Sequence, residues 1–229
     1  MAGGEIIHTD SPCAGERIPA DGKWNWMYGE PSEREFTVAK VDAYNNINSY
    51  LAELQGTTMK TAEDIVAYAD ANSGTEGARA GDHAAFASGQ DLFNEVVAHR
   101  GVEDGTYRKA LSCTRRKSRD EGIDAALHVT KDGRSIELDA LLQCDGRGAG
   151  QQIAAQAGYP IITIPIGIDA GGIPVGLSLQ HTAWQEGALI KWASAIEDLL
   201  LSSRGRRHAP GYRNPLAKNI PVDEDSLFS

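Results

Sequence analysis

Polar side chains that could exchange protons lie at the ends of three predicted strands. His8 ends the strand EIIH and Asp10 follows it, Cys144 ends the strand ELDALLQC and Asp145 follows it, and His181 follows GLSLQ. Histidine titrates near neutral pH, so with a carboxylate it can serve as general acid and base without a covalent step. Ligands of α/β sheets bind at the carboxyl ends of strands, which predicts one shared site. Its expected catalytic residues are His8, Asp10, Asp145 and His181, and its expected substrate-binding residues are Cys144, Gln152, Trp24 and Trp184.

Each of these residues also has a simpler interpretation. A histidine at a strand end is more often hydrogen-bonded or exposed than catalytic. Asp145 precedes a glycine and could be an ordinary turn residue, and Cys144 could be a small buried apolar side chain. Trp184 could belong to the core. The sequence leaves these alternatives open.

Composition limits the classes of function. The chain has 229 residues, 41% of them hydrophobic, and a net charge of −10, which disfavours nucleic-acid partners. Its basic cluster of Arg115, Arg116, Lys117 and Arg119 is interpreted as a solvated helix face. No apolar run reaches the roughly 18 residues of a membrane span, and no signal peptide is visible. We therefore expect a cytoplasmic protein without membrane contact.

The three cysteines do not predict a metal site. Cys13, Cys113 and Cys144 stand at no metal-ligand spacing, and their odd number favours reduced thiols inside a cell. We expect neither a metal nor a cofactor, and a small molecule as the substrate.

Periodicity predicts helices in the first half of the chain. Apolar residues recur every three or four positions from about 33 to 55. Thr61 begins a capping-box-like TAED, and Ser88 is the expected N-cap of a helix that carries Leu92, Phe93, Val96 and Val97. A further helix is expected from Tyr107 to about Gly122. Residues 1–32 are expected to form a strand and an irregular segment, and 33–136 to be mainly helical.

The second half is expected to supply a sheet and its closing helix. ELDALLQC (137–144) has apolar residues on both faces, which is typical of a covered central strand. A helix over 151–157, a strand in YPIITIPIG and a strand from Ile173 to His181 follow, the last two joined by a DAGG hairpin turn. Leu189, Trp192 and Ile196 predict the closing helix. The chain is thus expected to be one α/β domain over 1–229, with a mixed central sheet flanked by helices over 137–201 and an extended tail over 202–229.

These segments together resemble a known family. LDALL, IAAQAGYPIITIPIG and IPVGLSLQHTAW are similar to the C-terminal part of the amidase signature family, closest to its long fungal members. The similarity extends upstream through WNWMYGE, KVDAYNNINSYLAEL, TAEDIVAYADANSGTEG and HAAFASGQD. It implies an α/β/α sandwich built on a large mixed sheet, of which this chain would be a truncated domain.

The resemblance also shows what is missing. Family members hydrolyse amides with a Ser, cis-Ser, Lys triad, whose lysine and Gly/Ser-rich loop lie N-terminal to the matching region. No such loop stands in 1–229, and nucleophile, base and oxyanion donors work as one unit. The chain is therefore not expected to be a conventional serine amidase.

Three functions remain open. The chain could be a repurposed small-molecule enzyme that performs a non-hydrolytic cyclisation, isomerisation or elimination, which we favour because polar groups stand at several strand ends. It could be half of a split amidase that needs a partner, or a catalytically dead binding remnant. Removal of the front of the fold would expose sheet edges, so a homodimer is expected.

Overall fold

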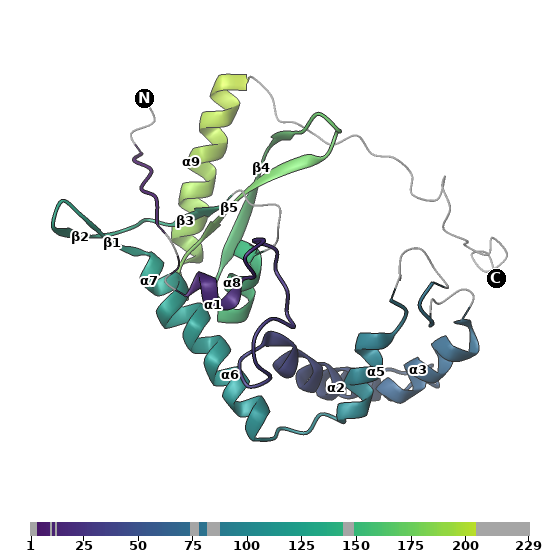
Figure 1. Cartoon of the computed structure of the whole chain (residues 1–229). Helices are drawn as coiled ribbons and strands as arrows, with labels where there is room; N and C mark the ends of the chain where they lie inside the picture. Colours follow the sequence, from purple (N-terminus) through teal and green to yellow (C-terminus); the bar gives the residue numbers. More distant parts are fainter. Residues whose placement is uncertain are drawn as a thin grey trace.

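The chain folds into a group of helices and a small sheet, joined by one long helix. The computed structural model describes residues 4–9, 11, 13–73, 78–81, 88–143 and 149–204. Helices α2, α3 and α5 lie together on one side of the molecule, and α6 leads from them to the sheet. Helices α8 and α9 lie beside the sheet (Figure 1). No helix among the described residues is long and apolar enough to cross a membrane.

Local signals position the first helices. After the short α1 (Ala14–Arg17), α2 spans Glu35–Glu53, α3 spans Ala62–Ala71, α5 spans Asp91–His99 and α6 spans Gly105–Ser118. Thr61 caps α3 as expected, since its side chain accepts from the Asp64 N–H at 3.1 Å and the Asp64 carboxylate closes the capping box. Ser88 is not the N-cap of α5. Gly89 has a φ of +64°, so the chain still turns there, and Gln90 precedes the helix.

A β-hairpin occupies part of the segment that was expected to be helical. The chain leaves α6 through one π-helical turn (Arg119–Ile123) and the short α7 (Asp124–Ala126). Strands β1 (His128–Lys131) and β2 (Arg134–Glu137) then pair antiparallel around Asp132 and Gly133, which both have positive φ. Glu137 therefore ends this hairpin and does not begin the next strand.

The second sheet has three strands in the order β3-β5-β4. Strand β3 spans Leu141–Gln143, β4 spans Ile161–Ile168 and β5 spans Pro174–Gln180. Both neighbours of β5 run antiparallel to it, so β3 and β4 share a direction, and α8 (Ala149–Ala157) connects them. The prediction of a central strand in ELDALLQC is wrong within the described residues: β3 is three residues long and lies at an edge, because β5 takes the middle position.

The hairpin between β4 and β5 is confirmed. The Asp169 carboxylate accepts from the N–H groups of Gly171 and Ile173, both at 2.8 Å. Gly172 has a φ of +84°, a conformation that glycine adopts without strain. This short turn brings the two longest strands side by side.

Two apolar clusters hold the sheet to its helices. Leu189 and Ala193 of α9 (Glu186–Arg204) pack on Ile164 and Leu179, with Trp192 and Ile196 beside them. The second cluster joins the π-helical turn, α7 and α8 to β3. It contains Ile123, Ala126, Leu127, Leu141, Ala154 and Ala157. The α/β class is confirmed, and every pair of strands described is antiparallel.

The two ends of the chain depart from expectation. Residues 4–9 form no strand, so EIIH does not join the sheet. Instead, Glu5 pairs with Lys131 of β1, and the Thr9 hydroxyl donates to the Ala126 carbonyl at 3.3 Å. Helix α9 continues to Arg204, so residues 202–204 are helical, and the rest of the predicted tail lies outside the described residues.

Candidate functional site

Three of the eight predicted site residues, Asp10, Cys144 and Asp145, lie outside the described residues. His8 is exposed in the segment that runs beside β1. The Trp24 indole donates to the Glu35 carboxylate at 3.1 Å, which ties the irregular segment to the start of α2. The structure therefore leaves the predicted cluster as a hypothesis.

His181 is the predicted site residue with the most constrained surroundings. Its side chain follows β5 and is 8% exposed, and its Nδ1 accepts from the Thr182 N–H at 2.8 Å. Because Nδ1 accepts this bond, Nε2 is the ring nitrogen that can donate a hydrogen bond. Gln152 is half-buried on α8. Trp184 is 88% exposed at a φ of +65°, so it is neither a core residue nor covered by any described element.

A group of polar side chains that the sequence did not predict lies next to His181. The Tyr159 hydroxyl donates to Asp124 Oδ2 at 2.8 Å, and the Thr182 hydroxyl shares a hydrogen bond with Tyr159. The Arg119 guanidinium lies over the Tyr159 ring, 5.7 Å from its centroid. Burial raises the pKa of Tyr159, to which the bond to Asp124 adds, so its hydroxyl is a hydrogen-bond donor at neutral pH. Asp124 Oδ1 is buried with no partner in the described structure.

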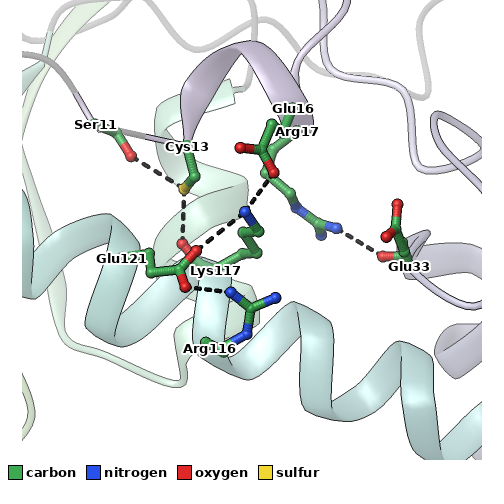
Figure 2. Close-up of polar contacts among 8 residues, drawn as sticks. All are labelled: Ser11, Cys13, Glu16, Arg17, Glu33, Arg116, Lys117 and Glu121. Atoms are coloured by element: carbon green, nitrogen blue, oxygen red, sulfur yellow. Dashed lines mark hydrogen bonds and ion pairs between the residues drawn. The ribbon is translucent and has the colours of Figure 1, made fainter.

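A second polar cluster joins the N-terminal segment to α6 (Figure 2). The Lys117 amine pairs with Glu16 of α1 and, at 3.0 Å, with Glu121 of the π-helical turn. The Cys13 thiol donates to the Lys117 carbonyl at 2.9 Å, and Arg116 also pairs with Glu121. Lys117 thus connects α1 and the π-helical turn to α6.

The Lys117 amine cannot act as a base at neutral pH. Hydrogen bonds from Lys117 to Glu16, and then to Glu121, raise the pKa of the amine, so the amine is protonated at neutral pH. The carboxylate of Glu121 has a lowered pKa, chiefly because of Lys117 and then Arg116. A protonated lysine cannot remove a proton from a nucleophile. This cluster is a structural contact.

Replacement of Lys117 by Gln is expected to lower the melting temperature at pH 7 by about 2–4 °C, because its side chain is only 13% exposed and Glu16 and Glu121 both lose their ion pair with it. The raised pKa of Lys117 contributes stability that is present below the unfolded value of about 10.4 and is lost as pH rises above it. The lowered pKa of Glu121 contributes stability that is lost as pH falls below about 4.3. Thermal melts across pH check both limits.

Lys131→Gln is the control for that series. Lys131 pairs with Glu5, but both side chains are largely exposed, so its loss should change the melting temperature little. A difference between wild type and Lys117→Gln that stays the same at pH 3, 7 and 11 would show that charge pairing is not the cause.

Two open grooves lie along α6. One is lined by Ser32, Glu33, Arg108, Lys109, Ser112, Cys113 and Arg116, and the other by Arg108, Leu111, Ser112, Arg115, Arg116, Arg119 and Asp120. Neither lining includes a predicted site residue. Their basic character differs from the acidic character of the chain as a whole.

Comparison with known proteins relates the chain to amidases. No protein-family model matches it. A Schizosaccharomyces pombe protein whose name describes it as an amidase is 44% identical over 96% of this chain and 37% of its own length. An Arabidopsis thaliana protein, also named as an amidase, is 28% identical over 68% of this chain and 27% of its own length.

A solved structure agrees with the sequence comparison. The peptide amidase of Stenotrophomonas maltophilia superposes with a TM-score of 0.59 at 28% identity, over 79% of this chain and 35% of that enzyme. The chain spans about a third of the length of these relatives. The resemblance in the sequence is thereby confirmed: the chain is similar to part of an amidase.

Proposed function

We propose that the chain is one part of a two-part amide hydrolase, active only with a second part that supplies the nucleophile and its base. The supporting observation is the three-stranded sheet, whose outer strands both expose apolar side chains. Leu142 of β3 is 47% exposed, and Ile161 and Ile168 of β4 are 38% and 41% exposed. Strand edges with exposed apolar residues favour the addition of another strand or chain.

Helix α9 covers one face of this sheet with apolar side chains, whereas on the other face only the part around Leu141 packs against apolar residues of α8. Ile162 and Ile164 point toward α9, whereas Thr163, between them, faces the other way, is exposed and shares a hydrogen bond with Ser178 at 2.9 Å. Nearer α8 the second face is closed by the Gln180 amide, which donates to Gln143 Oε1 at 2.8 Å. The open part beside Thr163 offers polar groups to a second layer.

The contacts of the described serines and lysines support the need for a second part. Ser178 bonds to Thr163, and Ser118 donates to the Arg115 carbonyl. The amine of Lys117 pairs with glutamates, and that of Lys191 lies 4.6 Å from the Trp192 ring centroid. Amide hydrolysis by the family triad needs a serine activated by a lysine.

Complementation tests the proposal directly. The chain is co-expressed with the segment of the S. pombe relative that it does not match, and ammonia release from a small primary amide is measured. Activity is expected only when both polypeptides are present. Ile161→Asp at the β4 edge should abolish it, whereas Ile6→Asp, at a residue that is exposed far more fully, should not. Failure of the two polypeptides to associate, or association without ammonia release, would count against the proposal.

The second candidate is non-hydrolytic acid/base chemistry on a small molecule, as a cyclisation, isomerisation or elimination. The observation in its favour is the group formed by Asp124, Tyr159, Thr182 and the adjacent buried His181. This function would need no second polypeptide, which distinguishes it from the first. A catalytically dead remnant would be inactive both alone and with a second polypeptide.

The same exposed edges lead us to propose that the chain forms a homodimer when no second part is present. Burial of Leu142 at the β3 edge, or of Ile161 at the β4 edge, in an interface between two copies would remove apolar surface from water. Light scattering at micromolar concentration is expected to give twice the mass of 24.5 kDa. A strictly monomeric species would contradict this prediction.

A further inference from the structure

The strongest unassigned feature is a row of guanidinium groups on one face of α6 and the turn that follows it. Arg108, Arg115 and Arg119 stand seven and four residues apart, with Leu111 and Ser112 between the first two. Residues at these spacings share one face of a helix. Together with Arg116 and Asp120 they line a groove of about 610 Å³. We call this the arginine groove.

The positive charge of the arginine groove is only partly balanced. Arg116 pairs with Glu121, and Arg119 donates from Nε to the Ala157 carbonyl at 2.7 Å. Arg108 and Arg115 are exposed and form no ion pair with a carboxylate of the described residues. Guanidinium groups bind carboxylates by paired hydrogen bonds, so this groove fits an acidic ligand.

We propose that the occupant of the arginine groove is the acidic segment of the chain's own tail, VDEDS at 222–226. It carries Asp223, Glu224 and Asp225, and no lysine or arginine follows Lys218. The charge of this segment is opposite to that of the groove, which is the first requirement for a docking surface. The inference is independent of the proposed function.

The tail is long enough to reach the groove. Helix α9 has 19 residues and packs along β4, and β4 begins just after Tyr159, whose ring contacts Arg119. At 1.5 Å per residue the end of α9 is about 28 Å along the helix from its start. The 18 residues from 205 to 222 span up to about 60 Å when extended.

The spacing of charges also matches. In an extended segment, Asp223 and Asp225 project on the same side about 6.6 Å apart. Arg115 and Arg119 are one helical turn apart, which is about 6 Å. Two carboxylates could therefore meet two guanidinium groups in register.

Peptide binding to the full chain tests the assignment. The probe is a fluorescent peptide of sequence NIPVDEDSLFS (219–229), and the receptor is the full chain with Asp223→Asn, Glu224→Gln and Asp225→Asn. Fluorescence anisotropy at low salt should show binding to this tail-neutral chain. Wild type should bind the probe roughly tenfold more weakly, because its own tethered tail competes at about millimolar effective concentration.

Variants of the groove locate the site. Arg108→Gln with Arg115→Gln in the tail-neutral chain should weaken probe binding by roughly tenfold, and salt should do the same by screening. Arg134→Gln, an exposed arginine of β2, should leave binding unchanged. Equal binding of the neutral peptide NIPVNQNSLFS would overturn the proposal. So would equal affinity of wild type and the tail-neutral chain for inorganic phosphate, which would show an open anion site only.

Discussion

The isolated chain is expected to hydrolyse simple amides and esters no faster than buffer and to remain unlabelled by a serine-directed fluorophosphonate. Loss of a triad nucleophile costs about a million-fold in kcat in serine hydrolases, because nucleophile, base and oxyanion donors act together. The serines with described contacts offer no substitute. Ser202 and Ser203 at the end of α9 donate to the carbonyls of Leu199 and Leu200, as helix serines often do.

Intact-protein mass spectrometry after treatment with the reagent measures this. The co-expressed pair is the positive control, since its second part is expected to carry the reactive serine. Stoichiometric labelling of any serine in the chain by itself would refute the prediction and would also remove the reason to seek a second part.

Helices with strong local signals could be predicted from the sequence. The apolar period placed α2 (Glu35–Glu53) to within two residues, and Thr61 marked the start of α3 through its capping box. The start of α5 was misplaced because Ser88 is a good cap by type, yet Gly89 turns the chain before the helix can begin. Residue preference cannot tell which of several adjacent positions adopts the cap conformation.

Strand position was harder to predict than strand existence. Strands β4 and β5 and their hairpin were expected from isoleucine content and the DAGG turn, and the structure has them. The segment ELDALLQC was expected to be central, because it has apolar residues on both faces. In the structure Leu141 is buried against α7 and α8, whereas Leu142 is exposed at the edge. A strand with apolar residues on both faces can therefore be an edge strand with an exposed apolar side chain as well as a buried central strand.

The candidate site shows the limit of reasoning from spacing. His181 could be predicted as a site residue because it directly follows a predicted strand. The Tyr159–Asp124 hydrogen bond joins residues 35 positions apart, the first between α8 and β4 and the second at the start of α7. A tyrosine before Pro160 and an aspartate after a glycine and an isoleucine have no local signature. Only tertiary packing brings them together.

Ile164→Ala is expected to cost roughly 2–5 kcal/mol of the free energy of unfolding, through loss of burial and the cavity that remains. Ile164 is 4% exposed and contacts the cluster of Leu179, Leu189 and Ala193, so α9 would lose its main anchor on β4. Urea titration followed by circular dichroism measures the shift, which should move the midpoint and leave the slope unchanged.

Ile161→Ala on the same strand is the matched control. Ile161 has the same side chain as Ile164 but faces away from α9 and is 38% exposed, so its truncation should cost below about 1 kcal/mol. The two isoleucines should therefore separate two properties: Ile164 should govern the stability of the isolated chain, and Ile161 its association with a second part. If both truncations cost the same stability, β4 is not an exposed edge, and the main support for a two-part hydrolase is lost.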